Sequence, residues 1–385
     1  MIDKMKRLIT ALLLTLPFTF LSYFVAGIIF LNGKDTLRSI ALISAYVLIN
    51  FMFFMSFYTR KTDKFRSFLF IAIAVTFPVE FILGLFEMRG HLMVATFSDM
   101  IAGNVPFCHI VIPQTILPLL FKGQIVFPGT IDAFAYSAGY MIVFWIAASL
   151  LLGKGWCSWV CFFGGWEEGC SRMAKKPRIK LSPKIVWGAA AVLLIVILTT
   201  IEFATPTYCL WLCPFKACSE FIEVGSPLVV IQTIIFIVLF IGLVIILPFL
   251  SKKRTQCMVL CPFGAMQSVV DKINPFDIRI DKKNCISCKK CIKECPVMAV
   301  SEKSLESGKV GFTCTKCGKC MDACPKKAIH FHIKGTPIGG KIGRITRVIF
   351  LYLAYTIIAG MGSGFIASAI QRLLLFITTG SFLYS

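Results

Sequence analysis

Long apolar runs, separated by short polar segments, make up most of this chain. A helix needs about 20 predominantly apolar residues to cross the ~30 Å hydrocarbon core of a membrane. We expect the first run, at about 8–31, to remain as a membrane anchor, because it is longer than the apolar core of a signal peptide. The apolar tail 367–385 contains Gln371 and Arg372, and it is expected to form a second short helix, a re-entrant segment or an interfacial one. Seven runs predict transmembrane helices, at about 8–31, 38–58, 67–88, 131–152, 184–204, 227–250 and 345–366.

Lysine and arginine mark alternate connections between these runs. Cytoplasmic connections of membrane proteins carry an excess of both residues. They gather in 4–7, 60–66, 172–180 and 252–254, whereas the opposite connections are poor in them: 33–37, 89–130 and 205–226. The pattern therefore predicts a multi-pass protein of a prokaryotic cell (inner) membrane, with its N-terminus in the cytoplasm.

Composition agrees with a membrane protein and argues against nucleic-acid binding. Hydrophobic residues make up 57% of the chain and charged residues 15%, whereas soluble proteins carry about 25% charged residues. The net charge is +21, but the basic residues lie in short clusters between apolar runs rather than along one nucleic-acid-binding face. We expect membrane lipid and an acidic partner protein as neighbours. The six tryptophans near the ends of the runs, Trp159 among them, are expected to form an interfacial belt.

Cysteine spacing gives the strongest chemical signal, because 17 cysteines in a chain of this kind indicate metal ligation rather than disulfides. Two segments, 285–296 and 314–325, read C-x2-C-x2-C-x3-C-P. In bacterial ferredoxins three close thiolates of such a run hold one [4Fe–4S] cluster and the fourth Cys holds the other cluster. A zinc site would use four ligands and leave four of these eight cysteines idle. The predicted sets are Cys285, Cys288, Cys291 and Cys324 for the first cluster, and Cys314, Cys317, Cys320 and Cys295 for the second.

These motifs complete the expected domain plan. The predicted fold is an integral membrane α-helical bundle of about seven transmembrane helices, with a cytoplasmic α+β domain of the bacterial 2[4Fe–4S] ferredoxin type. The expected parts are N-terminal transmembrane helices at 1–130 with an external cap at 89–130, a transmembrane core at 131–262, the ferredoxin domain at 263–343 and C-terminal transmembrane segment(s) at 344–385.

A second cysteine pattern, C-x3-C followed by Pro or Phe and then Phe, recurs at intervals of about fifty residues and indicates one structural unit used three times. The three copies begin at Cys157, Cys209 and Cys257. The first and third copies lie in predicted cytoplasmic connections and can form a third cluster site, unless they are small buried hydrophobes. The ligand set is Cys157, Cys161, Cys257 and Cys261, with Cys170 as an alternative ligand.

The second copy belongs to the opposite side of the membrane if the flanking helices cross it fully. The alternatives for its cysteines are an outer [4Fe–4S] cluster and a disulfide, which an oxidising exterior permits. His109 is a further candidate ligand, or a structural histidine. Clusters at both faces would be separated by ~30 Å of hydrocarbon. Efficient electron transfer across the membrane therefore needs clusters that dip inward, a quinone or flavin, or a partner's cofactor. The outer set is Cys108, Cys209, Cys213 and Cys218.

With these motifs the sequence resembles NapH-type membrane subunits of quinol dehydrogenases and related polyferredoxin membrane proteins, over about 131–330. The resemblance implies a subunit that links a redox partner to quinone. The chain departs from the pattern at Phe162, which stands where a proline is expected, by the extra motif at Cys209 and Cys213, and by additional transmembrane runs.

We therefore expect a membrane-bound electron-transfer subunit without catalytic side chains of its own. Its [4Fe–4S] clusters, with iron as the sole metal, would connect a cytoplasmic ferredoxin, iron–sulfur or flavoprotein subunit to the quinone pool or to an outer-face acceptor. The rival hypotheses are a redox-dependent maturation or regulatory protein and a subunit of an ion-translocating oxidoreductase. Glu80, inside the third run, is either a proton relay or a structural carboxyl group.

Overall fold

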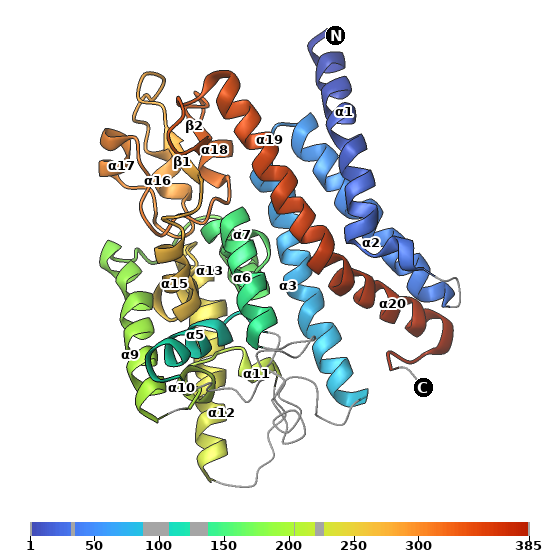
Figure 1. Cartoon of the computed structure of the whole chain (residues 1–385), viewed down its shortest axis with the longest axis vertical. Coiled ribbons are helices and arrows are strands. Elements are labelled where there is room, and N and C mark those ends of the chain that lie inside the picture. The colour runs from blue at the N-terminus through green and yellow to red at the C-terminus, as the bar shows by residue number, and fades with distance from the viewer. Residues whose placement is uncertain are drawn as a thin grey trace. The chain divides into compact units, whose positions relative to one another are not determined.

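The computed structural model describes residues 2–31, 35–87, 108–123, 138–203, 205–219 and 227–383 (Figure 1). The chain forms two compact units, which are described separately. The first unit comprises 1–83, 155–166 and 275–385, and the second comprises 84–154 and 167–274.

Within the described residues, five helices are long and apolar enough to cross a membrane, and a sixth results if the bent pair Ile142–Leu151 and Gly153–Trp159 is counted as one span. The five helices are Lys4–Val25, Thr36–Tyr58, Pro183–Phe203, Pro227–Ser251 and Gly340–Thr379. They match five of the predicted runs, and the third predicted run lies in helix α3, Thr62–Glu87. A multi-pass helical membrane protein is thereby supported.

Two boundaries differ from the sequence-based expectation. Helix α1, Ile2–Val25, ends before residue 31, because Gly27 adopts a left-handed conformation with φ of 74°. The last span continues to Thr379 through α19, Gly340–Ile357, a π-helical segment at Ile358–Gly362 and α20, Ser363–Thr379. At 1.5 Å per residue such a helix is about 60 Å long, so it exceeds the hydrocarbon core.

The first unit combines membrane helices with the polar domain. Helix α2, Thr36–Tyr58, packs against α1 and α20, and the rings of Phe18 and Phe53 stack with centroids 4.0 Å apart. A Cβ atom at Gly362 would lie 2.5 Å from Ile73 Cδ1. A larger residue at Gly362 would therefore require the Ile73 side chain to move.

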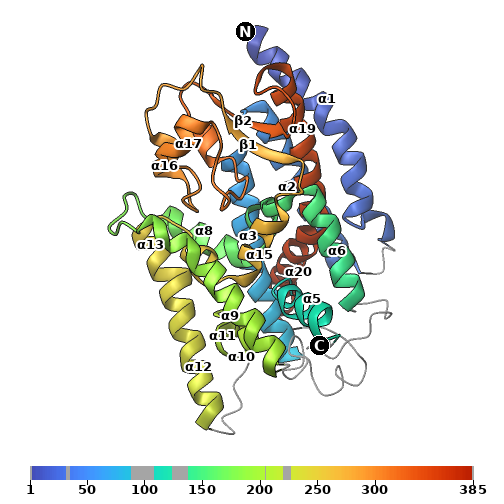
Figure 2. The same ribbon diagram turned by 60° about the vertical axis from the view of Figure 1, so that its left-hand side comes forward.

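The polar domain of the first unit is α+β, as the ferredoxin motifs predict. Strands β1, Phe276–Ile280, and β2, Ile329–Ile333, pair antiparallel with Phe276 opposite Ile333. Three short helices belong to it: α16, Lys290–Glu294; α17, Glu302–Ser307; and α18, Lys319–Ala323. Figures 1 and 2 both show β2 beside α19, where Phe331 stacks on Phe350 with centroids 4.6 Å apart.

The second unit is built around α9, Gly188–Phe203, which packs against α5, Val111–Lys122, and α15, Pro262–Val270. Its other long elements are α6, Ala138–Leu151, and the span formed by α12, Pro227–Leu239, a π-helical segment at Phe240–Ile246 and α13, Leu247–Ser251. Of the predicted external cap at 89–130, the structure describes 108–123, including α5.

Candidate iron–sulfur sites

The first ferredoxin ligand set converges on one pocket. Cys285, Cys288 and Cys291, from the loop before α16 and its first turn, line this pocket together with Cys324, which follows α18. The structure thus brings the fourth cysteine of one motif to the three close cysteines of the other. This is the crossed arrangement that the spacing predicts, and the binding of a cluster there remains a prediction.

The second set also gathers around one side chain. Burial raises the pKa of the Cys320 thiol, and the charges of Cys317, Cys314 and Cys295 raise it further. Cys291 of the first set adds a smaller effect, so the two sets are neighbours.

The two halves repeat the same backbone with an offset of 29 residues. Left-handed residues occur at Ser287 and Lys316, and again at Lys289 and Gly318. Helices α16 and α18 each begin one residue before the third cysteine of their motif. Such turns expose backbone N–H groups along the loop, which is the geometry that anionic clusters need.

The thiols of both sets suit a [4Fe–4S] cluster. The Ala299 N–H lies 3.2 Å from Cys295 Sγ and the Ala328 N–H lies 3.3 Å from Cys324 Sγ, so each donates to a ligand sulfur. Burial raises the pKa of the Cys291 thiol, and the positive charge of iron would reverse that effect by stabilising the thiolate. All sixteen cysteines whose side chains the structure describes are free thiols.

Each C-x3-C motif takes the same local form. The first cysteine lies in a helix of four or five residues: α7, Trp156–Trp159; α10, Thr207–Trp211; or α14, Thr255–Val259. The second cysteine follows that helix, and two residues later Phe163, Phe215 or Phe263 is buried. Each motif therefore has a buried phenylalanine two residues after its second thiol.

The proposed inner set is divided between the two units. Cys157 and Cys161 belong to the first unit, whereas Cys257, Cys261 and the alternative ligand Cys170 belong to the second. Its assembly into one site therefore stays a prediction.

A buried carboxyl group, missed by the sequence reasoning, positions the third motif. Glu167 accepts the N–H of Gln256 at 2.6 Å and that of Cys257 at 3.2 Å. Burial raises the pKa of Glu167 to about 7, although the positive charge of Arg254 acts to lower it. Arg254 pairs with Glu168 at 3.4 Å and lies 3.8 Å from Cys257 Sγ. The signal available in the sequence was the pair of adjacent acidic residues, Glu167 and Glu168, in a mainly apolar segment.

We expect Glu167→Ala to destabilise the loop that carries Cys257, because one buried and one partly buried N–H group lose their acceptor. Each unsatisfied group costs about 1–3 kcal/mol. Glu167→Gln retains a carbonyl oxygen and should lose less. Thermal unfolding of the full chain in detergent, with thiol labelling of Cys257, measures both effects. Equal stability of the two variants would contradict this role for the carboxyl oxygens.

The proposed outer cysteines converge in the second unit as far as the structure describes them. Burial raises the pKa of the Cys213 thiol, and the charges of Cys209 and Cys108 add to this effect. Gln114 Nε2 lies 3.2 Å from Cys209 Sγ. Cys218 lies in helix α11, Lys216–Ser219, but its side chain is outside the described residues.

One tyrosine connects the second and third motifs. The Gln256 side-chain amide lies 3.5 Å from the Tyr208 hydroxyl, and the Tyr208 N–H donates to Gln114 at 3.1 Å. Burial raises the pKa of the Tyr208 phenol, and the charges of Cys213, Cys261 and Cys209 contribute. Residues adjacent to Cys209 and Cys257 thus touch, so these motifs lie closer than the full ~30 Å hydrocarbon thickness that two opposite faces would impose.

Two weaker candidates are placed differently. His109 is buried, its ring centroid lies 4.6 Å from that of Phe263, and burial lowers its pKa to about 3. This environment suits a neutral histidine. Glu80 lies within α3, but its side chain is outside the described residues.

The second ferredoxin loop is fixed to the rest of the first unit. Ser158 Oγ donates to Thr315 Oγ1 at 2.7 Å, and Trp159 Nε1 donates to the Lys316 carbonyl oxygen at 3.1 Å. Trp159 is fully buried, so its expected place in an interfacial belt is wrong: its indole N–H has a backbone partner instead. Both residues lie between Cys157 and Cys161.

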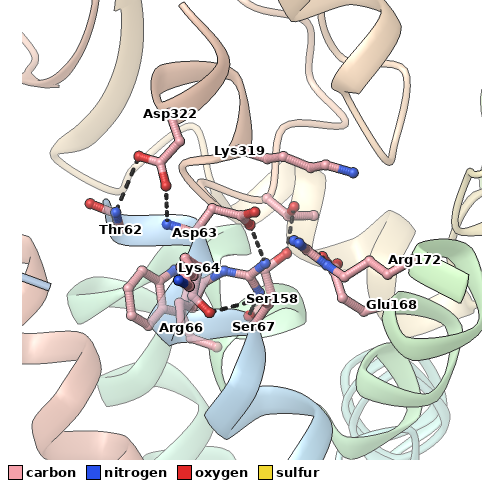
Figure 3. A network of polar contacts seen from close by, with 12 residues as sticks. Thr62, Asp63, Lys64, Arg66, Ser67, Ser158, Glu168, Arg172, Lys319 and Asp322 are labelled. Atoms are coloured by element: carbon pink, nitrogen blue, oxygen red, sulfur yellow. Dashed lines mark hydrogen bonds and ion pairs between the residues drawn. The ribbon is translucent and has the colours of Figure 1, made fainter. Parts of the chain in front are cut away.

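A polar network at the start of α3 completes this anchor (Figure 3). Asp322 accepts the N–H of Thr62 at 3.1 Å and that of Asp63 at 2.8 Å. Arg66 pairs with Asp63 at 2.7 Å and donates to the Ser158 carbonyl oxygen at 2.5 Å. The network joins α3, the first C-x3-C motif and α18.

Domain models match both cysteine patterns. A "4Fe-4S dicluster domain" matches 284–329, and a "4Fe-4S binding domain" matches three times, at 134–180, 185–230 and 233–281. Each of the three copies contains one C-x3-C motif, which confirms the predicted internal repeat. Together with the apolar helices, these matches define a membrane protein with 4Fe–4S ferredoxin-type domains.

The chain is similar to two curated proteins over part of its length. The chain is 27% identical over 193 residues to the "Putative electron transport protein YccM" of Escherichia coli K12, covering 46% of this chain and 51% of YccM. It is 27% identical over 165 residues to the "Regulatory protein NosR" of Pseudomonas aeruginosa, covering 40% of this chain and 22% of NosR. The chain thus spans about half of YccM and less of NosR. No solved structure matches it. The chain thus carries 4Fe–4S ferredoxin-type domains and is similar over part of its length to an electron-transport protein.

Proposed function

We propose that this protein is a membrane-bound electron-transfer subunit between a cytoplasmic redox protein and the quinone pool or an outer-face acceptor. The observation that carries the proposal is the convergence of Cys285, Cys288, Cys291 and Cys324 on one pocket, in a chain with at least five apolar helices among its described residues. A [4Fe–4S] cluster bound there supplies one-electron transfer without transfer of a chemical group.

The chain's own residues supply spacing and environment. Ala299 and Ala328 donate N–H groups to ligand sulfurs, and such hydrogen bonds tune the potential of a cluster. Ser158 and Trp159 hold the second ferredoxin loop beside the first C-x3-C motif. The contact between Tyr208 and Gln256 joins the second and third motifs, which supports cysteine sets that dip inward from the membrane faces.

Reconstituted vesicles test this function. Reduced ferredoxin added outside should reduce quinone, or an enclosed dye, over many turnovers. We expect Cys213→Ser to abolish reduction of the enclosed dye, while ferredoxin is still oxidised until the remaining sites fill. A maturation or regulatory protein would stop after about one turnover. A voltage probe during electron flow would separately reveal an ion-translocating subunit.

A further inference from the structure

The two ferredoxin halves share a backbone but differ in what covers their loops. In the second half Thr315, Lys316, Cys317 and Gly318 are buried. Ser158 and Trp159 cover that loop, and a Cβ atom at Gly318 would lie 3.2 Å from Thr62 Cγ2.

In the first half the equivalent loop is open. All five residues of 286–290 are exposed, and Ile286 keeps 56% of its surface accessible. Cys288 is the one exposed cysteine among those that the structure describes. Since the backbone repeats, the difference lies in the surroundings rather than in the loop.

Basic side chains surround this exposed loop. Lys289, Lys290 and Lys326 line the same pocket as the first cysteine set. Lys282, Lys283 and Lys327 are also exposed. Glu302 offsets part of this charge through its ion pair with Lys289, but it is outnumbered. An exposed isoleucine among lysines is a small apolar centre with a charged rim, which suits a transient complex of small area.

We propose that the loop 286–290 together with Lys326, here called the 286–290 surface, docks an acidic soluble electron-carrier protein. The inference rests on the proposed function and adds the entry surface and the charge of the partner. Complementary charge steers encounter and fixes orientation more than it adds affinity. An apolar contact at Ile286 would then bring the partner against the exposed Cys288. Anionic lipid is the competing occupant, and it has no requirement for a redox ligand at the centre of the surface.

Charge reversal on the full chain, in nanodiscs of neutral lipid, tests the proposal with an acidic 2[4Fe–4S] ferredoxin as the probe. We expect Lys290→Glu/Lys326→Glu to slow association about tenfold or more at low salt and to flatten its salt dependence. Lys309→Glu/Lys334→Glu carries the same charge change on exposed lysines outside the pocket and should change association less than twofold.

Iron per chain and reduction by a small-molecule reductant distinguish a failure of the proposed function from a failure of the docking surface alone. A wild-type chain without iron would overturn the proposed function itself. Normal iron with equal ferredoxin association in both double variants would overturn the docking surface alone. Unchanged ferredoxin association, with binding to anionic vesicles lost in Lys290→Glu/Lys326→Glu, would also overturn it and assign the surface to lipid.

Discussion

Anaerobically purified wild-type protein is expected to contain about sixteen iron atoms and as many acid-labile sulfides per chain, because four cysteine sets would each hold a cubane of four. Cys291→Ala and Cys320→Ala should each lower the count by about four, and so should Cys213→Ala. Cys170→Ala is the matched control, because Cys170 lies outside the four predicted sets, and the iron count of this variant should not change; a loss of about four iron atoms would instead make Cys170 a ligand of the third set. About eight iron atoms in the wild type would restrict the clusters to the ferredoxin domain, and zinc in place of iron would contradict all four sets.

The crossed ligand sets also predict which cysteines share a cluster, and paramagnetic resonance can test this. Because Cys324 lines the pocket of Cys285, substitution of either residue should remove the same paramagnetic resonance signal from the reduced protein. Cys295→Ala should remove the other ferredoxin signal, since Cys295 lies near Cys320. A pairing of Cys324 with Cys320 instead would contradict the crossed arrangement.

The sequence was informative wherever one local pattern determines structure. Apolar runs located five spans to within a few residues, apart from the first and last ends, which depend on Gly27 and on helix continuation beyond 366. The C-x2-C-x2-C-x3-C-P spacing anticipated which cysteines converge, because spacing controls what a short loop can wrap. The threefold C-x3-C repeat was visible for the same reason.

Tertiary contacts were not predictable from these patterns. The two ferredoxin loops have equal cysteine spacing, so this spacing does not distinguish the buried loop at 315–318 from the exposed loop at 286–290. Ser158 and Trp159 lie between two cysteines and carry no motif of their own. The contact between Tyr208 and Gln256 joins residues 48 positions apart, and it depends on how the helices of the second unit pack.

Arg66 shows most clearly how a local pattern misleads. From the sequence it counts as one of the basic residues of a cytoplasmic connection, yet its side chain is 0% exposed. It neutralises Asp63 and donates to the Ser158 carbonyl oxygen. A basic residue that counts toward the predicted orientation of a helix in the membrane can thus also serve as a buried structural link.

Arg66→Ala is therefore expected to destabilise the first unit by about 3–5 kcal/mol, because it removes the guanidinium that pairs with the buried Asp63 carboxylate. Lys61→Ala removes an exposed charge from the same connection and should change stability by less than about 0.5 kcal/mol. Thermal unfolding in nanodiscs measures the loss of stability. Separate proteolysis at 315–319 of the folded protein measures the release of the second ferredoxin loop.

The double variant Arg66→Met/Asp63→Leu distinguishes the loss of the ion pair from the cost of keeping the Asp63 carboxylate buried. Since both charges are removed, it should be more stable than Arg66→Ala, although it lacks the same ion pair. It also lacks the hydrogen bond to the Ser158 carbonyl oxygen, so proteolysis at 315–319 should remain faster than in the wild type. If Arg66→Ala were as stable as Lys61→Ala, the network would not anchor the ferredoxin domain, and the burial of the 315–318 loop would need another cause.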